Sequence, residues 1–238
     1  MINRRLLRIK LLQAFYAYTK RDNDSIPYAE KELLHSIEKS FDLYYFLLLL
    51  LVDIVDYAEA RIDQARQKMI PTHTDLNPNT RFIDIWFVKE LRDHSIFKKA
   101  VKNKGISWLN SPELIKTMFL EVKESNVYSE FMAKEEDDLQ SEKKLLLSIF
   151  TEVIAPSEDL CQILEDQSIY WNDDSAFIIS RILKDIKRSN PGNLYMPEPG
   201  LVFKEKDDEF FVKNLFRKSI IHQEEYRGLI EKYAKNWD

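Results

Sequence analysis

Apolar residues recur every three or four positions along most of this chain, which is the spacing of helices with one buried face. In the first segment, Leu7, Leu11, Ala14 and Tyr18 follow this spacing, and Asn3 precedes them as a residue that caps helices well. We therefore predict an N-terminal helix that begins after Asn3, ends near Tyr18 and turns these four side chains toward a core.

The next stretch predicts two helices, over residues 28–40 and 42–68. Between Leu43 and Val52 the second of these is apolar on nearly every side, which places it at the centre of a helical bundle. Further helices are expected to begin near residues 82, 112, 127, 142, 158, 175, 208 and 224, the first of them with a break near residues 93–94.

Glycine is scarce, with 4 residues among 238, and no two of them lie within six positions of each other. This spacing excludes the glycine-rich phosphate loops and the G-x-S-x-G nucleophile turn. Glycine scarcity also disfavours β-hairpins, so the predicted fold class is all-α. Three prolines and two glycines between Ser189 and Gly200 mark the clearest linker, and a short strand is possible over 201–203.

No spacing of reactive side chains predicts catalysis, a metal site or a cofactor, so we expect no enzyme. A single cysteine, Cys161, excludes an internal disulfide and is expected as a small buried apolar side chain. The four histidines form no i, i+4 pair. The acidic run 135–138 is interpreted as a helix start, and Tyr170-Trp171 as an aromatic plug before an Asp174 cap.

The longest apolar run has ten residues, too few to cross a bilayer. The N-terminus lacks the features of a secretory signal. A cytoplasmic protein without membrane contact is expected.

Charge is distributed unevenly. The chain carries a formal net charge of -5, yet residues 1–21 contain six basic residues and no acidic one, which leaves -11 for the remainder. Arginine forks match phosphate oxygens, and Arg4, Arg5 and Arg8 fall on one side of a helix start. Gln13 and Tyr16 lie further along that helix. From charge alone, a polyanion site and a merely solvated helix start both remain open.

Two segments resemble the NusB family of bacterial transcription antitermination factors. Residues 3–16 are similar to its first helix, with the pattern R-R-x-x-R followed by Q-A-F-Y. Near the other end, Glu225-Tyr226, Leu229-Ile230 and Lys235-Asn236-Trp237-Asp238 resemble the family stretch that ends in N-W-[DS].

The resemblance implies an all-helical protein that binds boxA-type single-stranded RNA. In that family the partner is a small-subunit ribosomal protein, NusE, and the complex helps RNA polymerase to read through terminators in ribosomal RNA operons. Carried onto this chain, RNA binding falls on the three arginines, with three further candidates along the helix. The complete set is Arg4, Arg5, Arg8, Lys10, Gln13 and Tyr16.

The resemblance also implies a division of the chain into three regions. Residues 1–70 would hold the NusB-like N-terminal helices, 71–200 an enlarged helical middle like that of the Bacteroidetes form, and 201–238 the start of an incomplete C-terminal subdomain. Because the family continues beyond this point, a C-terminal truncation is expected. The last helix, 224–237, should then expose an apolar face, which would weaken binding to the ribosomal partner and favour self-association.

A protein of another class is the alternative. The acidic remainder of the chain repels nucleic acid outside one helix, as expected for a helical protein-interaction scaffold that does not bind RNA.

Overall fold

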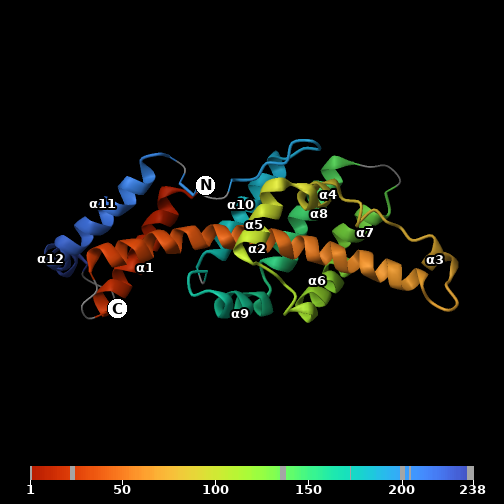
Figure 1. Ribbon diagram of the computed structural model, residues 1–238, viewed down its shortest axis with the longest axis horizontal. Helices are drawn as coiled ribbons and strands as arrows, with labels where there is room; N and C mark the ends of the chain where they lie inside the picture. The colour runs from red at the N-terminus through yellow and green to blue at the C-terminus, as the bar shows by residue number, and fades with distance from the viewer. Residues whose placement is uncertain are drawn as a thin grey trace. The chain divides into compact units, whose positions relative to one another are not determined.

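A computed structural model describes most of the chain (Figure 1). The described residues are 2–21, 25–134, 138–171, 173–198, 202–203 and 205–234. Within them the fold is all-α, as predicted, and the only extended pairings are two isolated β-bridges. None of the described helices is both long and apolar enough to cross a membrane.

The chain divides into two compact units. The terminal unit contains Met1–Lys39 and Gly200–Asp238, and the central unit contains Ser40–Pro199. The two ends of the sequence therefore fold together, and the compact units meet in sequence at residues 39/40 and 199/200.

The terminal unit is built from α1 (Arg4–Lys20), the first part of α2 (Ile26–Arg66), α11 (Asp208–Ile221) and α12 (Gln223–Tyr233). The Asn3 side chain caps α1 by accepting from the Leu6 backbone N–H at 3.0 Å, as predicted. Leu7 and Leu11 are buried, and α1 packs along α11. The backbone N–H of Ile2 donates to the Val202 carbonyl at 2.9 Å, which gives the extended segment near 202–203 a partner at the N-terminus.

The prediction of two helices over 28–40 and 42–68 is wrong: one helix, α2, spans Ile26–Arg66 without interruption. The side chains of Ser40 and Asp42, at the predicted break, are buried against residues far along the sequence. Ser40 Oγ donates to Asp174 Oδ2 at 2.5 Å, and Lys104 Nζ lies 2.8 Å from Asp42 Oδ1.

The central unit surrounds the apolar half of α2 with shorter helices. These are α3 (His73–Leu76), α4 (Trp86–Asp93), α5 (Ser95–Lys104), α6 (Pro112–Glu124), α7 (Asn126–Met132), α8 (Leu139–Ser148), the π-helix η1 (Ile149–Ile154), α9 (Glu158–Gln167) and α10 (Ser175–Arg188). Leu43, Leu47 and Leu51 are fully buried, which confirms the predicted central position of this segment.

Aromatic side chains fill the core beside α2. Phe46 stacks on Trp108 with ring centroids 3.9 Å apart, and the Trp108 indole N–H donates to the Phe46 carbonyl at 3.0 Å. Trp171 packs against the same Phe46 and is buried, which confirms the aromatic plug. Asp174 precedes α10, but its side chain makes no capping bond because it accepts from Ser40 instead.

Other details differ from the sequence-based expectations. The break between α4 and α5 lies at His94, as predicted, whereas the helix expected over 142–153 changes from α to π at Ile149. Cys161 is exposed, not buried, because Leu160 and Leu164 define the buried face of α9. Three residues of the acidic run, 135–137, lie outside the described part, as do residues 235–238 of the second family-like segment.

Candidate nucleic-acid interface

The candidate interface lies at the beginning of α1, in the terminal unit. Leu6, Leu7 and Leu11 form the buried apolar face of α1, so residues outside this face on the helical wheel are turned toward solvent. Arg4, Arg5 and Arg8 all have exposed side chains. The structure therefore keeps the three predicted arginines on the surface of the first two turns.

Arg4 is held in place by α11. Its Nε donates to Asp208 Oδ1 at 2.8 Å, and its guanidinium lies 4.8 Å from the centre of the Phe211 ring. The hydrogen bond to Asp208 raises the pKa of Arg4 above its ordinary value. Asp208 itself is buried, and its second oxygen accepts from the Glu205 backbone N–H at 3.0 Å. The positive charge of Arg4 is thus already paired with a carboxylate of the protein, that of Asp208.

Arg8 shares the same aromatic ring. Its guanidinium lies 5.7 Å from the Phe211 centroid, within the range of a cation–π contact. Neither Arg5 nor Arg8 forms an ion pair with any residue that the structure describes. Both therefore keep hydrogen-bond donors that can face a phosphate group.

The other three candidates are placed differently. Lys10 is only 1% exposed and so does not share the surface of the arginines. Gln13 is exposed but lies about 140° around the helix from Arg8. Tyr16 is exposed, and Lys20 Nζ lies 5.5 Å from its ring centre.

Two apolar residues of this surface were not predicted. Ile9 and Leu12 are exposed on α1 between the arginines and Tyr16. Arg5, Ile9, Leu12 and Tyr16 follow each other at steps of three or four residues, so they lie along one face of the helix. The helical spacing of Ile9, Leu12 and Tyr16 is the sequence signal from which this exposed apolar face could have been predicted. Asp208 and Phe211 had no such signal, because they approach α1 from the opposite end of the sequence.

The two compact units differ in sign of charge. The terminal unit contains 16 basic and 13 acidic residues, a formal charge of +3, whereas the central unit contains 19 and 27, a formal charge of -8. The exposed surface formed by Arg4, Arg5 and Arg8, the arginine surface, therefore belongs to the unit with a positive formal charge. This charge favours binding of a polyanion to the terminal unit over binding to the central unit.

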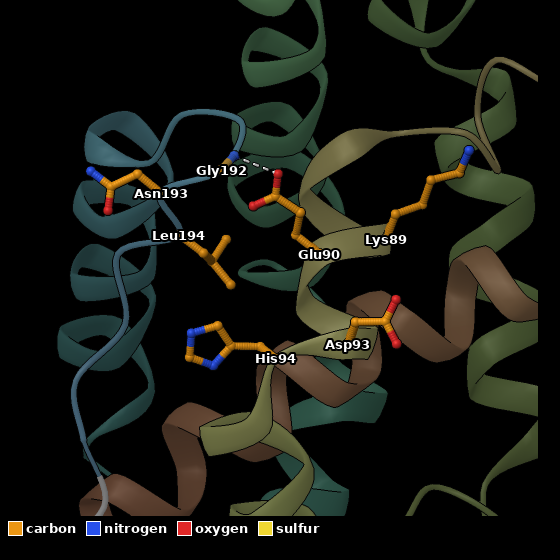
Figure 2. Close-up of a pocket in the computed structure, with 7 residues that line it drawn as sticks. All are labelled: Lys89, Glu90, Asp93, His94, Gly192, Asn193 and Leu194. Carbon is orange, nitrogen blue, oxygen red and sulfur yellow. Dashed lines mark hydrogen bonds between the residues drawn. The ribbon is translucent and has the colours of Figure 1, made fainter.

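A cleft of about 520 Å³ in the central unit is the second place where polar side chains gather (Figure 2). Glu90 Oε1 accepts from the Gly192 backbone N–H at 2.7 Å, and the His94 ring points toward the segment 192–194. Lys89 and Asp93 point away from that segment in Figure 2, and Lys89 pairs with Asp84 at 2.7 Å.

The residues that line this cleft do not form a recognisable catalytic arrangement. His94 Nδ1 is buried without a hydrogen-bond partner among the described residues, but no serine or cysteine lines the cleft beside it. Over the whole described part of the chain, no group of three or more histidine, cysteine, aspartate or glutamate side chains is arranged to hold a metal ion.

Comparisons with known proteins give no independent assignment. The chain matches no family model, no curated protein and no solved structure at significant similarity.

Proposed function

We propose that this chain is an RNA-binding protein of the NusB type, which binds boxA-type single-stranded RNA through the beginning of α1. The observation that carries this proposal is the exposed Arg5–Arg8 pair beside Arg4 and Phe211, in the unit with positive charge. The resemblance of residues 3–16 to the first NusB helix supports the same surface.

The chemistry of such binding follows from the side chains. Arg5 and Arg8 donate to phosphate oxygens along the strand, and Phe211 limits the movement of the Arg8 guanidinium. Tyr16 offers an exposed ring on which an unpaired base can stack. Arg4 acts mainly through position, because Asp208 already occupies its Nε. No catalytic step is part of this function.

The partners proposed with this function come from the resemblance. A small-subunit ribosomal protein, NusE, shares the reading of RNA bases, and the complex acts on RNA polymerase in the cytoplasm during transcription of ribosomal RNA operons. Lys10 is left out of the proposed RNA contacts because it is buried.

Loss of salt dependence tests the arginine surface. For single strands, each lost phosphate contact reduces the slope of log K against log salt concentration by about 0.7. We expect Arg5→Ala/Arg8→Ala to weaken binding of a labelled boxA-type RNA and to lower the slope by about 1.4. Fluorescence anisotropy at several salt concentrations measures both quantities.

The chain offers a matched control in the central unit. Lys99 and Lys102 on α5 are exposed and have the same i, i+3 spacing as the two arginines. Lys99→Ala/Lys102→Ala removes the same charge and should leave the slope unchanged. An equal loss in both double variants would mean that net charge, not the α1 surface, governs binding.

A protein-interaction scaffold is the second candidate function. It is favoured by the exposed apolar side chains of α12 and by the charge of -8 on the central unit. Protein partners that stay bound after nuclease treatment and at high salt would support this candidate, whereas partners released by nuclease would support RNA binding.

A further inference from the structure

The last described helix, α12, presents a continuous apolar stripe to solvent. No residue of α12 is buried. Its four large apolar side chains are spaced i, i+3, i+4 and i+7, so they share one face about 100° wide. Their exposed fractions are Tyr226 41%, Leu229 46%, Ile230 62% and Tyr233 72%.

A helix of this length needs cover on its apolar face. α12 has 11 residues, and isolated helices shorter than about 12–15 residues are only marginally stable in water. Such helices derive their stability from packing of the apolar face, yet here that face meets solvent. Contiguous exposed apolar stripes of this kind mark interaction surfaces, whereas single exposed side chains do not.

The charges beside the stripe are self-complementary. Glu225 and Lys232 lie along one edge of it, and Arg227 and Glu231 lie beyond the other. When two copies of α12 run antiparallel about a twofold axis near Leu229, equal edges meet. Glu225 then lies near Lys232 of the other copy, and Arg227 lies opposite Glu231, so that opposite charges face each other along both edges.

The same register also aligns the apolar side chains. Tyr226 of one copy comes close to Tyr233 of the other, and the two Leu229 side chains meet at the axis. The charged contacts within one copy do not prevent this pairing. Arg227 Nε lies 3.9 Å from Glu231 Oε1, and His222 Nδ1 lies 3.0 Å from Glu225 Oε2. Both pairs are exposed, so replacing these contacts by contacts to a second copy costs little free energy.

We propose that α12 is a homodimer interface, in which the apolar stripes of two copies of this chain pack antiparallel. Nucleic acid does not fit this surface, because it is apolar and carries three glutamates against two basic residues. The inference uses no residue of the arginine surface, so its failure would leave the proposed RNA binding untouched.

The oligomeric state of the full chain tests the interface. Sedimentation equilibrium should show a concentration-dependent rise from the monomer mass of 28.4 kDa to twice that value. Ile230→Lys should keep the chain monomeric at the same concentrations. At dilutions where the wild type is also monomeric it should leave the melting temperature nearly unchanged, because Ile230 is already 62% exposed in the monomer. A wild-type chain that stays monomeric at high concentration would overturn the proposal.

Charge exchange tests the antiparallel register. Glu225→Lys should weaken dimerisation about three- to tenfold, because it places like charges together twice across the twofold axis. Glu225→Lys combined with Lys232→Glu should restore it. Glu224→Lys makes the same change of charge on the opposite side of α12 and is the matched control. Failure of the double exchange to restore dimerisation would contradict this register.

Cross-linking gives an independent reading of the register. In a Cys161→Ser background, which removes the exposed native thiol, Tyr226→Cys mixed with Tyr233→Cys should form a disulfide between unlike chains. Tyr226→Cys alone should form much less. The opposite preference would show that the helices do not pair as proposed.

Discussion

Asp53 lies within α2 at a position where burial acts against its charge. Removal of its carboxylate from water, together with the nearby charge of Asp56, raises the pKa of Asp53 to about 6. In the unfolded chain the carboxyl titrates near 4. Folding therefore favours the protonated form, and the folded state is penalised as pH rises from about 4 to about 6, after which the penalty stays constant.

The sign of this linkage predicts a pH-dependent gain from Asp53→Asn. Asparagine resembles the protonated acid, so the variant should match the wild type near pH 4 and exceed its stability near pH 7.5. The pKa difference corresponds to about 3 kcal/mol at most, and partial exposure of the side chain reduces the expected gain to about 1–2 kcal/mol. Urea unfolding at the two pH values measures it.

Asp166 on α9 supplies the control, because its carboxylate is exposed to water. Asp166→Asn should change stability little at either pH. A gain from Asp53→Asn that is equal at pH 4 and pH 7.5 would show that packing, not ionisation, is responsible.

At the scale of elements, an ion pair connects the first helix to the far end of the sequence. The Arg4–Asp208 pair joins the first turn of α1 to the first turn of α11, and the Ile2 backbone bonds to Val202 beside it. Asp208 is buried, so its carboxylate depends on the partners that the fold supplies.

We therefore expect Arg4→Ala to lower the melting temperature of the chain, because it removes a hydrogen-bonded cation from the buried Asp208 carboxylate. Arg5→Ala should not, since Arg5 forms no ion pair with the described residues. Thermal unfolding followed by circular dichroism compares the two variants. Equal melting temperatures would mean that the Arg4–Asp208 contact contributes nothing to the association of α1 with α11.

Local sequence predicted most helices but not the interactions that decide their ends. The caps at Asn3, Ser125 and Ser157 bond to nearby backbone, so short-range patterns suffice for them. Ser40 and Asp42 lie at the predicted break between two helices, yet their partners are Asp174 and Lys104, more than 60 residues away. The break predicted between Ser40 and Asp42 does not occur.

The π-helix η1 likewise could not be predicted from local sequence. An apolar run predicts a helix over 142–153 but carries no information on the hydrogen-bond step within it. Cys161 is the opposite case, because its exposure follows from the helical spacing of Leu160 and Leu164. The residue type alone suggested that Cys161 is buried, but the spacing of Leu160 and Leu164 places it outside the buried face of α9.

At the scale of the whole molecule, the division into two compact units coincides with a division of formal charge. The compact unit with formal charge +3 is the one assembled from both ends of the chain, and it contains α1, α11 and α12. The exposed arginines could be predicted from the sequence. Their support by Asp208 and Phe211 could not, because that contact joins residues about 200 positions apart.

The direct test of RNA binding by this chain is the affinity for a labelled boxA-type single-stranded RNA, measured by fluorescence anisotropy against a scrambled RNA of equal length. The proposed function predicts tighter binding of the boxA-type sequence, a further gain on addition of the ribosomal protein, and weaker binding by Arg5→Ala/Arg8→Ala. Equal affinity for both RNAs, with or without the partner and unchanged in the arginine variant, would contradict it.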